Sequence, residues 1–324
     1  MLVLGLQGSP RLEGNTARLL SAFMDEAKRL GGEIETLNVA EMDIHPCREC
    51  NACRKDGRCV IDDDMQAVYP LLRRADLVAA ASPMFFYGVT ASLKALIDRS
   101  QAMWNSRYVR GLSDPGRGIR RGVFLSVGAT KGDRLFEGAG LVFKYFFDAV
   151  GARHFGSLGF RGIEHIGDID GHPTALKDAA DLARGATADL LGRRRVLFLC
   201  RENACRSQMA WAFARKDAGS IIEPISAGDT PAAAVNPMMI EVMGEVGIDM
   251  SYLEPRSIEV ALAAGDPELI VSMGCMDACP VVPGVEVIDW EIDDPAGKTL
   301  PFMKRTRDDI RRKVAELVTS IGGE

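Results

Sequence analysis

The chain has 324 residues, more than the roughly 100–200 residues of one typical domain, so two domains are expected. Its net charge is −6, with acidic and basic residues mixed along the chain, which argues against nucleic-acid binding and against a polybasic membrane patch. The first residues lack a basic leader, and no apolar run approaches the roughly 20 residues of a membrane span, so we expect a cytoplasmic protein. Its expected partners are small molecules or other proteins.

The first half alternates between short apolar runs and segments in which apolar residues recur at helical spacing. Residues 2–7 predict a strand, residues 8–16 a turn-rich loop and residues 17–30 a helix. The alternation continues through a helix predicted at residues 91–101 to a helix predicted at residues 173–191. Strands that alternate with helices indicate a parallel sheet with both faces covered.

A second strand, loop and helix series begins after Gly192, with its loop at residues 200–207. We therefore expect two doubly wound α/β domains, at residues 1–192 and 193–324. No low-complexity stretch or long linker separates them, which favours close coupling of the two domains.

The eight cysteines fall into two separated groups of four. Thiols in the cytoplasm are kept reduced, so clustered cysteines there indicate ligands or catalysts rather than disulfides. The partition therefore suggests two redox-capable units. The groups are Cys47, Cys50, Cys53 and Cys59, and Cys200, Cys205, Cys275 and Cys279.

The first loop, GSPRLEGNT, has the small and hydroxyl residues of an anion-binding loop. Between a strand and a helix, its backbone N–H groups and the helix N-terminus can face a phosphate. It matches neither GxxxxGK[ST] nor GxGxxG, which disfavours a nucleoside triphosphate and the usual dinucleotide fingerprint. An ordinary helix cap made by Asn15 or Thr16 is the alternative. The candidate phosphate contacts are Ser9, Arg11, Asn15 and Thr16.

A second loop follows the buried strand DLVAAA, at the sheet edge where doubly wound folds hold ligands. It would bring apolar and aromatic faces to a planar ring, although core packing or a subunit contact could also explain its aromatic side chains. The candidate residues are Pro83, Met84, Phe85, Phe86, Tyr87 and Gly88.

Together, these two loops resemble those of the flavodoxin-like NAD(P)H-dependent FMN reductases. The resemblance covers most of the first half. It implies FMN, with its phosphate at the first loop, its isoalloxazine ring against the second, and a weaker contact from Gly128 to Thr130. It also implies NADPH or NADH as reductant, and a homodimer or tetramer.

Between the two loops lies PCRECNACRKDGRCVIDDDM, whose pattern CxxCxxCxxxxxC supplies four soft ligands at Cys47, Cys50, Cys53 and Cys59. Such a set suits an iron–sulfur cluster or zinc, and free thiols are the alternative. A compact cysteine motif before a DDM segment resembles the iron–sulfur flavoproteins of the same superfamily. That resemblance implies a 4Fe–4S cluster that exchanges electrons with FMN.

In the second half, CRENACRS fits the pattern CxxxxxRS. The loop amides can surround a tetrahedral oxyanion, Arg206 can close the cradle in a bidentate fashion, and Cys200 lies beneath as nucleophile. The helix N-terminus and the arginine predict a lowered thiol pKa. All four histidines lie in the first half, so activation falls to the loop itself, with Ser207 and Asn203 as hydrogen-bond partners.

CxxxxxRS, SAGDTPAAAVNP and DDPAGK together make residues 195–324 resemble the low-molecular-weight phosphatase superfamily. CRSQMA, MGCMDACP and DWEIDDPAGK resemble its arsenate reductases rather than its tyrosine phosphatases. The resemblance implies that Cys200 attacks arsenate, that Arg206 and the loop amides bind the arsenate or phosphate oxyanion, and that Asp294 protonates the leaving oxygen. Asp293 is the weaker candidate for this acid.

Arsenate reduction takes two electrons, so another thiol must resolve the adduct of Cys200. Members coupled to thioredoxin use two widely spaced cysteines, whereas only MDA separates Cys275 from Cys279, which resembles the branch that depends on a thiol cofactor. These two cysteines are either redox-active or simply buried apolar residues. Cys205 is either a resolving thiol or a residue that shapes the loop. Thioredoxin, mycoredoxin or a low-molecular-weight thiol is the expected external donor.

The fusion predicts an oxidoreductase of arsenic resistance, in which NAD(P)H reduces FMN and electrons reach the thiols of an arsenate reductase. A hydrolase is the alternative, namely a phosphotyrosine-type phosphatase whose thiol is regulated by the flavin domain. A third interpretation makes the second half a non-catalytic oxyanion sensor.

Overall fold

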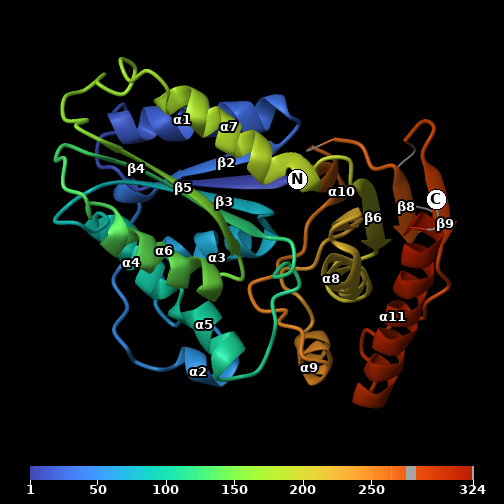
Figure 1. Ribbon diagram of the computed structural model, residues 1–324. Coiled ribbons are helices and arrows are strands. Elements are labelled where there is room, and N and C mark those ends of the chain that lie inside the picture. Colours follow the sequence, from blue (N-terminus) through green and yellow to red (C-terminus); the bar gives the residue numbers. More distant parts are fainter. Residues whose placement is uncertain (264, 275–281, 323–324) are drawn as a thin grey trace. The chain divides into compact units, whose positions relative to one another are not determined.

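The computed structural model describes residues 1–263, 265–274 and 282–322, and it divides into two compact units (Figure 1). The first unit comprises Met1–Arg110 and Gly116–Leu191, and the second comprises Gly111–Pro115 and Gly192–Glu324. Each unit is built on a parallel sheet with helices on both faces, which confirms the expected fold class. Within the described residues, no helix has the length and the apolar content needed to cross a membrane.

The sheet of the first unit has the order β2-β1-β3-β4-β5, and all its neighbouring strands are parallel. β1, β3 and β4 are buried almost throughout because they are central, which explains their nearly continuous apolar sequences. In a parallel sheet the carboxyl ends share one edge, so the loops that follow these three strands lie close together. The strands are β1 (Leu2–Gln7), β2 (Glu33–Asn38), β3 (Leu77–Pro83), β4 (Arg121–Gly128) and β5 (Arg153–Arg161).

Helices α1 (Asn15–Arg29) and α7 (Ala175–Thr187) cover one face of this sheet, and α3 to α6 cover the other (Figure 1). Leu19 and Phe23 of α1 share a buried cluster with Ala179 of α7. The predicted helix 91–101 ends earlier than expected, and a separate helix follows it. The remaining helices are η1 (Val39–Glu41), α2 (Cys53–Asp56), α3 (Met65–Arg74), α4 (Ala91–Arg99), α5 (Gln101–Tyr108), α6 (Glu137–Ala149) and η2 (Ala188–Leu190).

The second unit has a sheet of order β7-β6-β8-β9, again with parallel neighbours. The strand β6 is central, and its last residue, Cys200, is the predicted nucleophile. The strands are β6 (Arg194–Cys200), β7 (Ile222–Gly228), β8 (Leu269–Ser272) and β9 (Glu286–Asp289).

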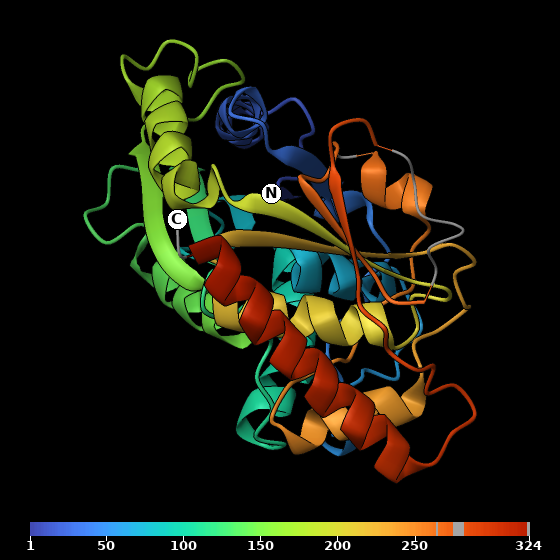
Figure 2. The same cartoon turned by 90° about the vertical axis from the view of Figure 1, so that its right-hand side faces the viewer.

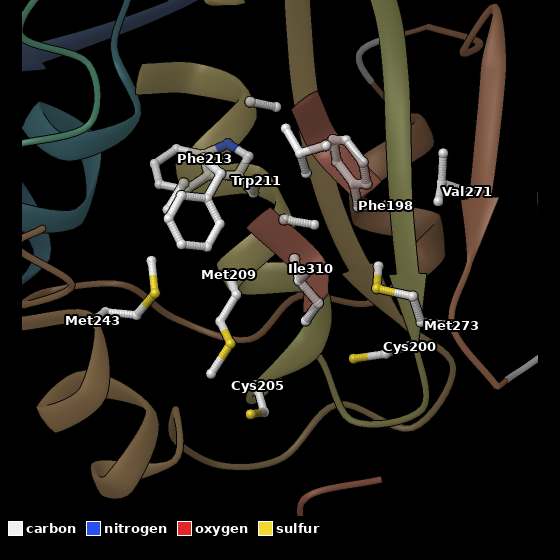
Figure 3. Close-up of a cluster of buried hydrophobic side chains, with 14 of the residues drawn as sticks. Phe198, Cys200, Cys205, Met209, Trp211, Phe213, Met243, Val271, Met273 and Ile310 are labelled. Carbon is white, nitrogen blue, oxygen red and sulfur yellow. The ribbon is translucent and has the colours of Figure 1, made fainter. Parts of the chain in front are cut away.

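One face of the second sheet carries the larger core, in which α8 (Arg206–Ala218) packs beside α11 (Leu300–Gly322) (Figure 2). Figure 3 shows this cluster, with Phe198 of β6, Phe213 of α8 and Ile310 of α11 among its members. α9 (Pro237–Glu245) contributes to the same core. The short helix α10 (Ile258–Leu262) covers the other face with a smaller cluster.

A five-residue segment from the middle of the first half belongs to the second unit. In Gly111–Pro115, the amide of Ser113 donates to the carbonyl of Gly247 (2.8 Å). The amide of Asp249 donates back to the carbonyl of Ser113 (2.9 Å), which forms a parallel bridge between Ser113 and Ile248. The chain therefore enters the second unit once before Gly192.

Candidate functional sites

A cavity of about 190 Å³ lies where β1, β3 and β4 end in the first unit. It brings together the two predicted loops and the third, weaker contact, although they are far apart in the sequence. Phe86, Tyr87 and Gly88 are not part of its lining. The predicted residues that line it are Ser9, Arg11, Asn15, Thr16, Pro83, Met84, Phe85 and Gly128.

The first helix begins without a side-chain cap, since its N-cap residue is Gly14 and no side chain there accepts a hydrogen bond. The alternative of a helix cap made by Asn15 or Thr16 is therefore wrong. Uncapped N–H groups at the start of a helix, with the positive end of its dipole, favour an anion. Both cavity-lining hydroxyl residues of this loop, Ser9 and Thr16, are buried, so the loop fits a phosphate group.

Asn15 is committed to neighbouring backbone groups. Its side-chain amide donates to the carbonyl of His165 (2.7 Å), and its Oδ1 accepts from the amides of Gly167 (3.0 Å) and Ile169 (3.3 Å). Asn15 thus fastens the loop after β5 beside the cavity. Gln7 Oε1 accepts from the amide of Ser9 (2.5 Å). The only sign of this contact in the sequence is a polar residue at the end of an apolar strand.

The aromatic loop forms a tight turn in which Phe85 and Gly88 exchange two backbone hydrogen bonds of 2.9 Å. Its central residues, Phe86 and Tyr87, have φ angles of 49° and 62°. This left-handed conformation costs an L-residue about 1–2 kcal/mol, and residues held there often belong to functional sites. Phe86 is fully exposed, and Phe85 and Tyr87 are half exposed, so core packing does not explain these aromatic side chains.

The four cysteines of the first group line one larger cavity, of about 460 Å³. Burial raises the pKa of the Cys53 thiol, and a hydrogen bond from Asn105 Nδ2 to its sulfur (3.1 Å) partly offsets this effect. The charges of Cys59 and Cys47 also raise it, so these thiols are near neighbours. Arg99, which lines the cavity, is a hydrogen-bond partner of Cys59.

This donor set fits a thiolate-bound cluster, because four soft ligands share one cavity and N–H donors face two of their sulfur atoms. Among the described residues, however, no three thiols, imidazoles or carboxylates are grouped closely enough to hold a single metal ion. The sequence analysis had not identified Arg99 and Asn105, which lie on helices outside the cysteine motif.

In the second unit, the loop after β6 holds the predicted nucleophile in a buried position. Cys200 is 3% exposed, and its Sγ lies 3.0 Å from Ser207 Oγ. Asn203 Nδ2 donates to the same hydroxyl (2.7 Å). The loop amides lead directly into α8, whose N-cap is Cys205 without a side-chain cap. The arrangement therefore places a thiol beside uncapped helix amides, a geometry that suits an oxyanion.

Asn203 locks the shape of this loop. It adopts a left-handed φ of 49° and is fully buried. Besides donating to Ser207, its Oδ1 accepts from the amide of Arg256 (2.8 Å) and from Gln208 Nε2 (3.1 Å). Gly228 lies so close that a Cβ there would approach the Asn203 amide to 2.7 Å. Gln208, Gly228 and Arg256 are supporting residues that the loop motif alone did not reveal.

Arg206 is 6% exposed and connects the loop to the predicted acid. Its Nη2 lies 2.9 Å from Asp294 Oδ2, and its Nη1 donates to the carbonyl of Ile292 (3.0 Å). The carboxyl group of Asp294 is half exposed. The structure thus brings Arg206 and Asp294 together, 88 residues apart in the sequence, beside one loop.

The Cys205 thiol is buried, and its Sγ lies 3.3 Å from the sulfur of Met303. Burial raises its pKa strongly, and the nearby charge of Cys200 adds to the effect. A buried neutral thiol suits the loop-shaping interpretation of Cys205 better than that of a resolving nucleophile. Cys275 and Cys279 lie outside the described residues.

Comparison with known proteins finds relatives of both halves of the chain. A family model described as NADPH-dependent FMN reductase matches residues 1–137, and one described as low molecular weight phosphotyrosine protein phosphatase matches residues 195–324. An iron–sulfur flavoprotein of Methanocaldococcus jannaschii is 39% identical over 103 residues, which make up 32% of this chain and 53% of that protein. The chain spans about half the length of the iron–sulfur flavoproteins that it matches.

Two further relatives match the second half over nearly their full length. Arsenate reductase 2 of Staphylococcus haemolyticus is 36% identical over 133 residues, 40% of this chain and 99% of that protein. An arsenate reductase of Brevibacillus brevis is 39% identical over 126 residues, 38% of this chain and 92% of that protein.

Fold and site thus define a protein with two parallel-sheet domains, one with a flavodoxin-like ligand edge and one with a cysteine–arginine oxyanion loop. The chain belongs to the low molecular weight phosphotyrosine protein phosphatase family through residues 195–324, where its relatives are arsenate reductases, and residues 1–137 match the family model described as NADPH-dependent FMN reductase. Both resemblances are confirmed, and the hydrolase alternative is not favoured.

Proposed function

We propose that this chain is a two-part oxidoreductase, in which a flavin unit that uses NADPH or NADH supplies electrons to an arsenate reductase. The observation that carries the proposal is the constellation around Cys200. A buried thiol lies 3.0 Å from a hydroxyl, beside a helix N-terminus, an arginine and a carboxyl group. These are the groups that a cysteine nucleophile and an oxyanion require.

In the first step, the Cys200 thiolate attacks the arsenic atom of arsenate, while Arg206 and the loop amides bind its oxygens. One As–O bond breaks, and Asp294 gives a proton to the leaving oxygen, which departs as water. Ser207 and Asn203 stabilise the thiolate and the loop around it. The product is an adduct in which Cys200 sulfur is bonded to As(V).

In the second step, another thiolate attacks the Cys200 sulfur. A disulfide bond forms, the S–As bond breaks, and its electron pair stays on arsenic, which leaves as arsenite. Cys205 is poorly suited to this role because its raised pKa keeps the buried thiol protonated. Cys275 or Cys279 supplies the attacking sulfur within the chain, and an external donor such as thioredoxin, mycoredoxin or a low-molecular-weight thiol takes this role if electrons do not pass between the two domains.

In the first unit, Ser9, Thr16 and the uncapped start of α1 would hold the FMN phosphate, with Arg11 at the cavity wall. Met84 and Phe85 line the same cavity and would contact the ring system, and Asn15 keeps the neighbouring loop in place. Bound FMN would supply hydride and electron-transfer chemistry. The four cysteines of the first group would hold a 4Fe–4S cluster, which would supply one-electron chemistry.

In this proposal residues 1–192 and 193–324 are the two functional domains of a cytoplasmic homo-oligomer. Electrons pass from the flavin domain to the disulfide formed at Cys200. An oxyanion reductase needs a reductant, and the joined FMN reductase domain provides one within the same chain.

The proposal is tested with protein purified without oxygen and mixed with NADPH and arsenate, with no added thiol. We expect arsenite to form and NADPH to be oxidised in equal amounts, and Cys200→Ser protein to form none. If arsenite appears only when a thioredoxin system or a free thiol is added, electron transfer between the two domains is refuted while arsenate reduction stands. Faster hydrolysis of an aryl phosphate than reduction of arsenate would refute the reductase itself.

A further inference from the structure

Both ends of the cysteine loop are attached to one buried guanidinium group at the end of α4. Arg99 Nη1 donates to the carbonyl of His45 (3.0 Å), before the first cysteine, and Arg99 Nη2 donates to the carbonyl of Ile61 (3.2 Å), after the last. Arg99 also forms a fully buried ion pair with Asp63. The Asp63 carboxylate accepts in turn from the amide of His45 (2.9 Å). One cation thus fixes the entrance and the exit of the loop.

The same guanidinium faces the thiols. Arg99 lines their cavity, and Cys59 is one of its hydrogen-bond partners. An arginine side chain stays protonated in proteins, and the buried ion pair with Asp63 favours its charged form. Its Nε is buried and has no hydrogen-bond partner among the described residues. A positive charge is therefore held permanently beside the cysteines.

A second donor reaches the thiols from α5. Asn105 is 3% exposed, and its Nδ2 donates to Cys53 Sγ over 3.1 Å. Gln101, one turn earlier on the same helix, also lines the cavity but is exposed, and no described contact joins it to a thiol. The two amides therefore form a natural pair for comparison.

We propose that Arg99 and Asn105 are positioning residues that raise the reduction potential of the iron–sulfur cluster held by Cys47, Cys50, Cys53 and Cys59. The inference rests on the cluster of the proposed function. Reduction adds negative charge to a cluster and its sulfur ligands, so a buried cation and an N–H donor to sulfur stabilise the reduced form. Without these two groups, the cluster is harder to reduce.

The test uses the full chain, reconstituted with ferrous iron and sulfide under argon, and follows the cluster by EPR during a redox titration. Asn105→Leu removes one donor, and Gln101→Leu on the same helix is the matched control. Since removing Arg99 alone leaves Asp63 as an unpaired buried charge, the second variant is the double exchange Arg99→Gln with Asp63→Asn. We expect both test variants to shift the midpoint potential to more negative values, and the Gln101 variant to match the wild type.

A cluster whose potential is unchanged by Asn105→Leu overturns the inference and leaves the proposed cluster intact. If Asn105→Leu fails to hold the cluster, the double variant decides, and a wild-type potential there overturns the inference equally. Wild-type protein that retains no iron and no sulfide overturns both the cluster and the inference. The flavin absorption of the same samples shows whether the first unit is folded in each case.

Discussion

The two units share one local design, a loop between the first strand and the first helix of a parallel sheet, but the two loops differ in what they present. In the first unit the loop offers buried hydroxyl groups, from Ser9 and Thr16, and an uncapped helix start. In the second it offers Cys200, at the last position of its strand, and Arg206 at the start of the helix. The backbone of both loops has the geometry that suits an anion, but only the second loop adds a cysteine thiol beside it.

The loops also differ in how they are held. Asn15 of the first unit extends outward and fastens another segment of the chain. Asn203 of the second unit instead binds within its own loop, to Ser207, and to the Arg256 amide beside it, in a left-handed conformation. A ligand can stay bound while a loop adjusts, whereas a nucleophile must be held in line with its target.

The largest expected effect is a loss of arsenate reduction that leaves the flavin-binding loop unaffected. Cys200→Ser should lower arsenite formation by about three orders of magnitude or more, because a hydroxyl is a far weaker nucleophile than a thiolate. FMN content and the oxidation of NADPH by an artificial acceptor should stay unchanged. Arsenite is measured by chromatography with elemental detection, and Cys205→Ala is the control for loss of a nearby thiol. A Cys200→Ser protein that still reduces arsenate would show that the second loop is no more reactive than the first.

The next test concerns the locked conformation of Asn203. Asn203→Gly keeps the left-handed backbone but loses the side-chain hydrogen bonds, and Asn203→Ala also adds strain of about 1–2 kcal/mol. We expect both variants to lose at least about tenfold in kcat/KM for arsenate, since each lost hydrogen bond is worth about 1 kcal/mol. In urea unfolding, the alanine variant should be less stable than the glycine variant. Equal stability of the two variants would contradict the assigned strain.

The first loop can be tested by a smaller change. Thr16→Val preserves shape and removes one buried hydroxyl, so FMN should bind about tenfold more weakly, as expected for one hydrogen bond to a charged phosphate. Fluorescence titration of the flavin measures the dissociation constant. Arsenate reduction with an external thiol donor should not change, and Thr187→Val, in a helix away from the cavity, serves as control. Unaltered flavin affinity would remove Thr16 from the phosphate contacts.

The smallest effect is expected at high pH. The pKa of Cys205 is raised in the folded protein above its ordinary value of about 9. Above that pH the unfolded chain loses this proton while the folded chain keeps it, so the free energy of unfolding should fall as pH rises. Cys205→Val should flatten this decline. Urea unfolding between pH 7.5 and 10 measures how the free energy of unfolding changes with pH. In a separate experiment, iodoacetamide at pH 8 should label Cys200 in preference to Cys205. Rapid labelling of both thiols would contradict the raised pKa of Cys205.

The sequence predicted both sheets and the positions of both loops because these features depend on local patterns. Apolar runs, turn residues and the CxxxxxRS spacing are each visible within a few residues. The supporting groups were not predictable in this way. Gln208 and Arg256 act through contacts with Asn203, and Arg99 and Asn105 reach the cysteines from separate helices. Such contacts depend on tertiary packing and leave no spacing pattern.

The exact boundaries of the helices were also not predictable from local sequence patterns. The apolar periodicity at residues 91–101 predicted one helix, whereas the structure has two, ending at Arg99 and restarting at Gln101. Arg99, the last residue of the first helix, pairs with Asp63, and Asn105 of the second helix donates to Cys53 Sγ. The aromatic turn was located correctly as a loop, but its left-handed Phe86 and Tyr87 could not be foreseen, since bulky side chains rarely adopt that conformation.

The short segment Gly111–Pro115 matters for anyone who divides this protein. A fragment that starts at residue 193 contains the oxyanion loop and every strand of its sheet, but it lacks the backbone groups of Ser113 that bond to Gly247 and Asp249. The carbonyl of Gly247 and the amide of Asp249, which follow α9, would then face water. The natural border between the halves is therefore not a single peptide bond, and gene fusions or domain exchanges that respect the fold should carry this five-residue segment with the second half.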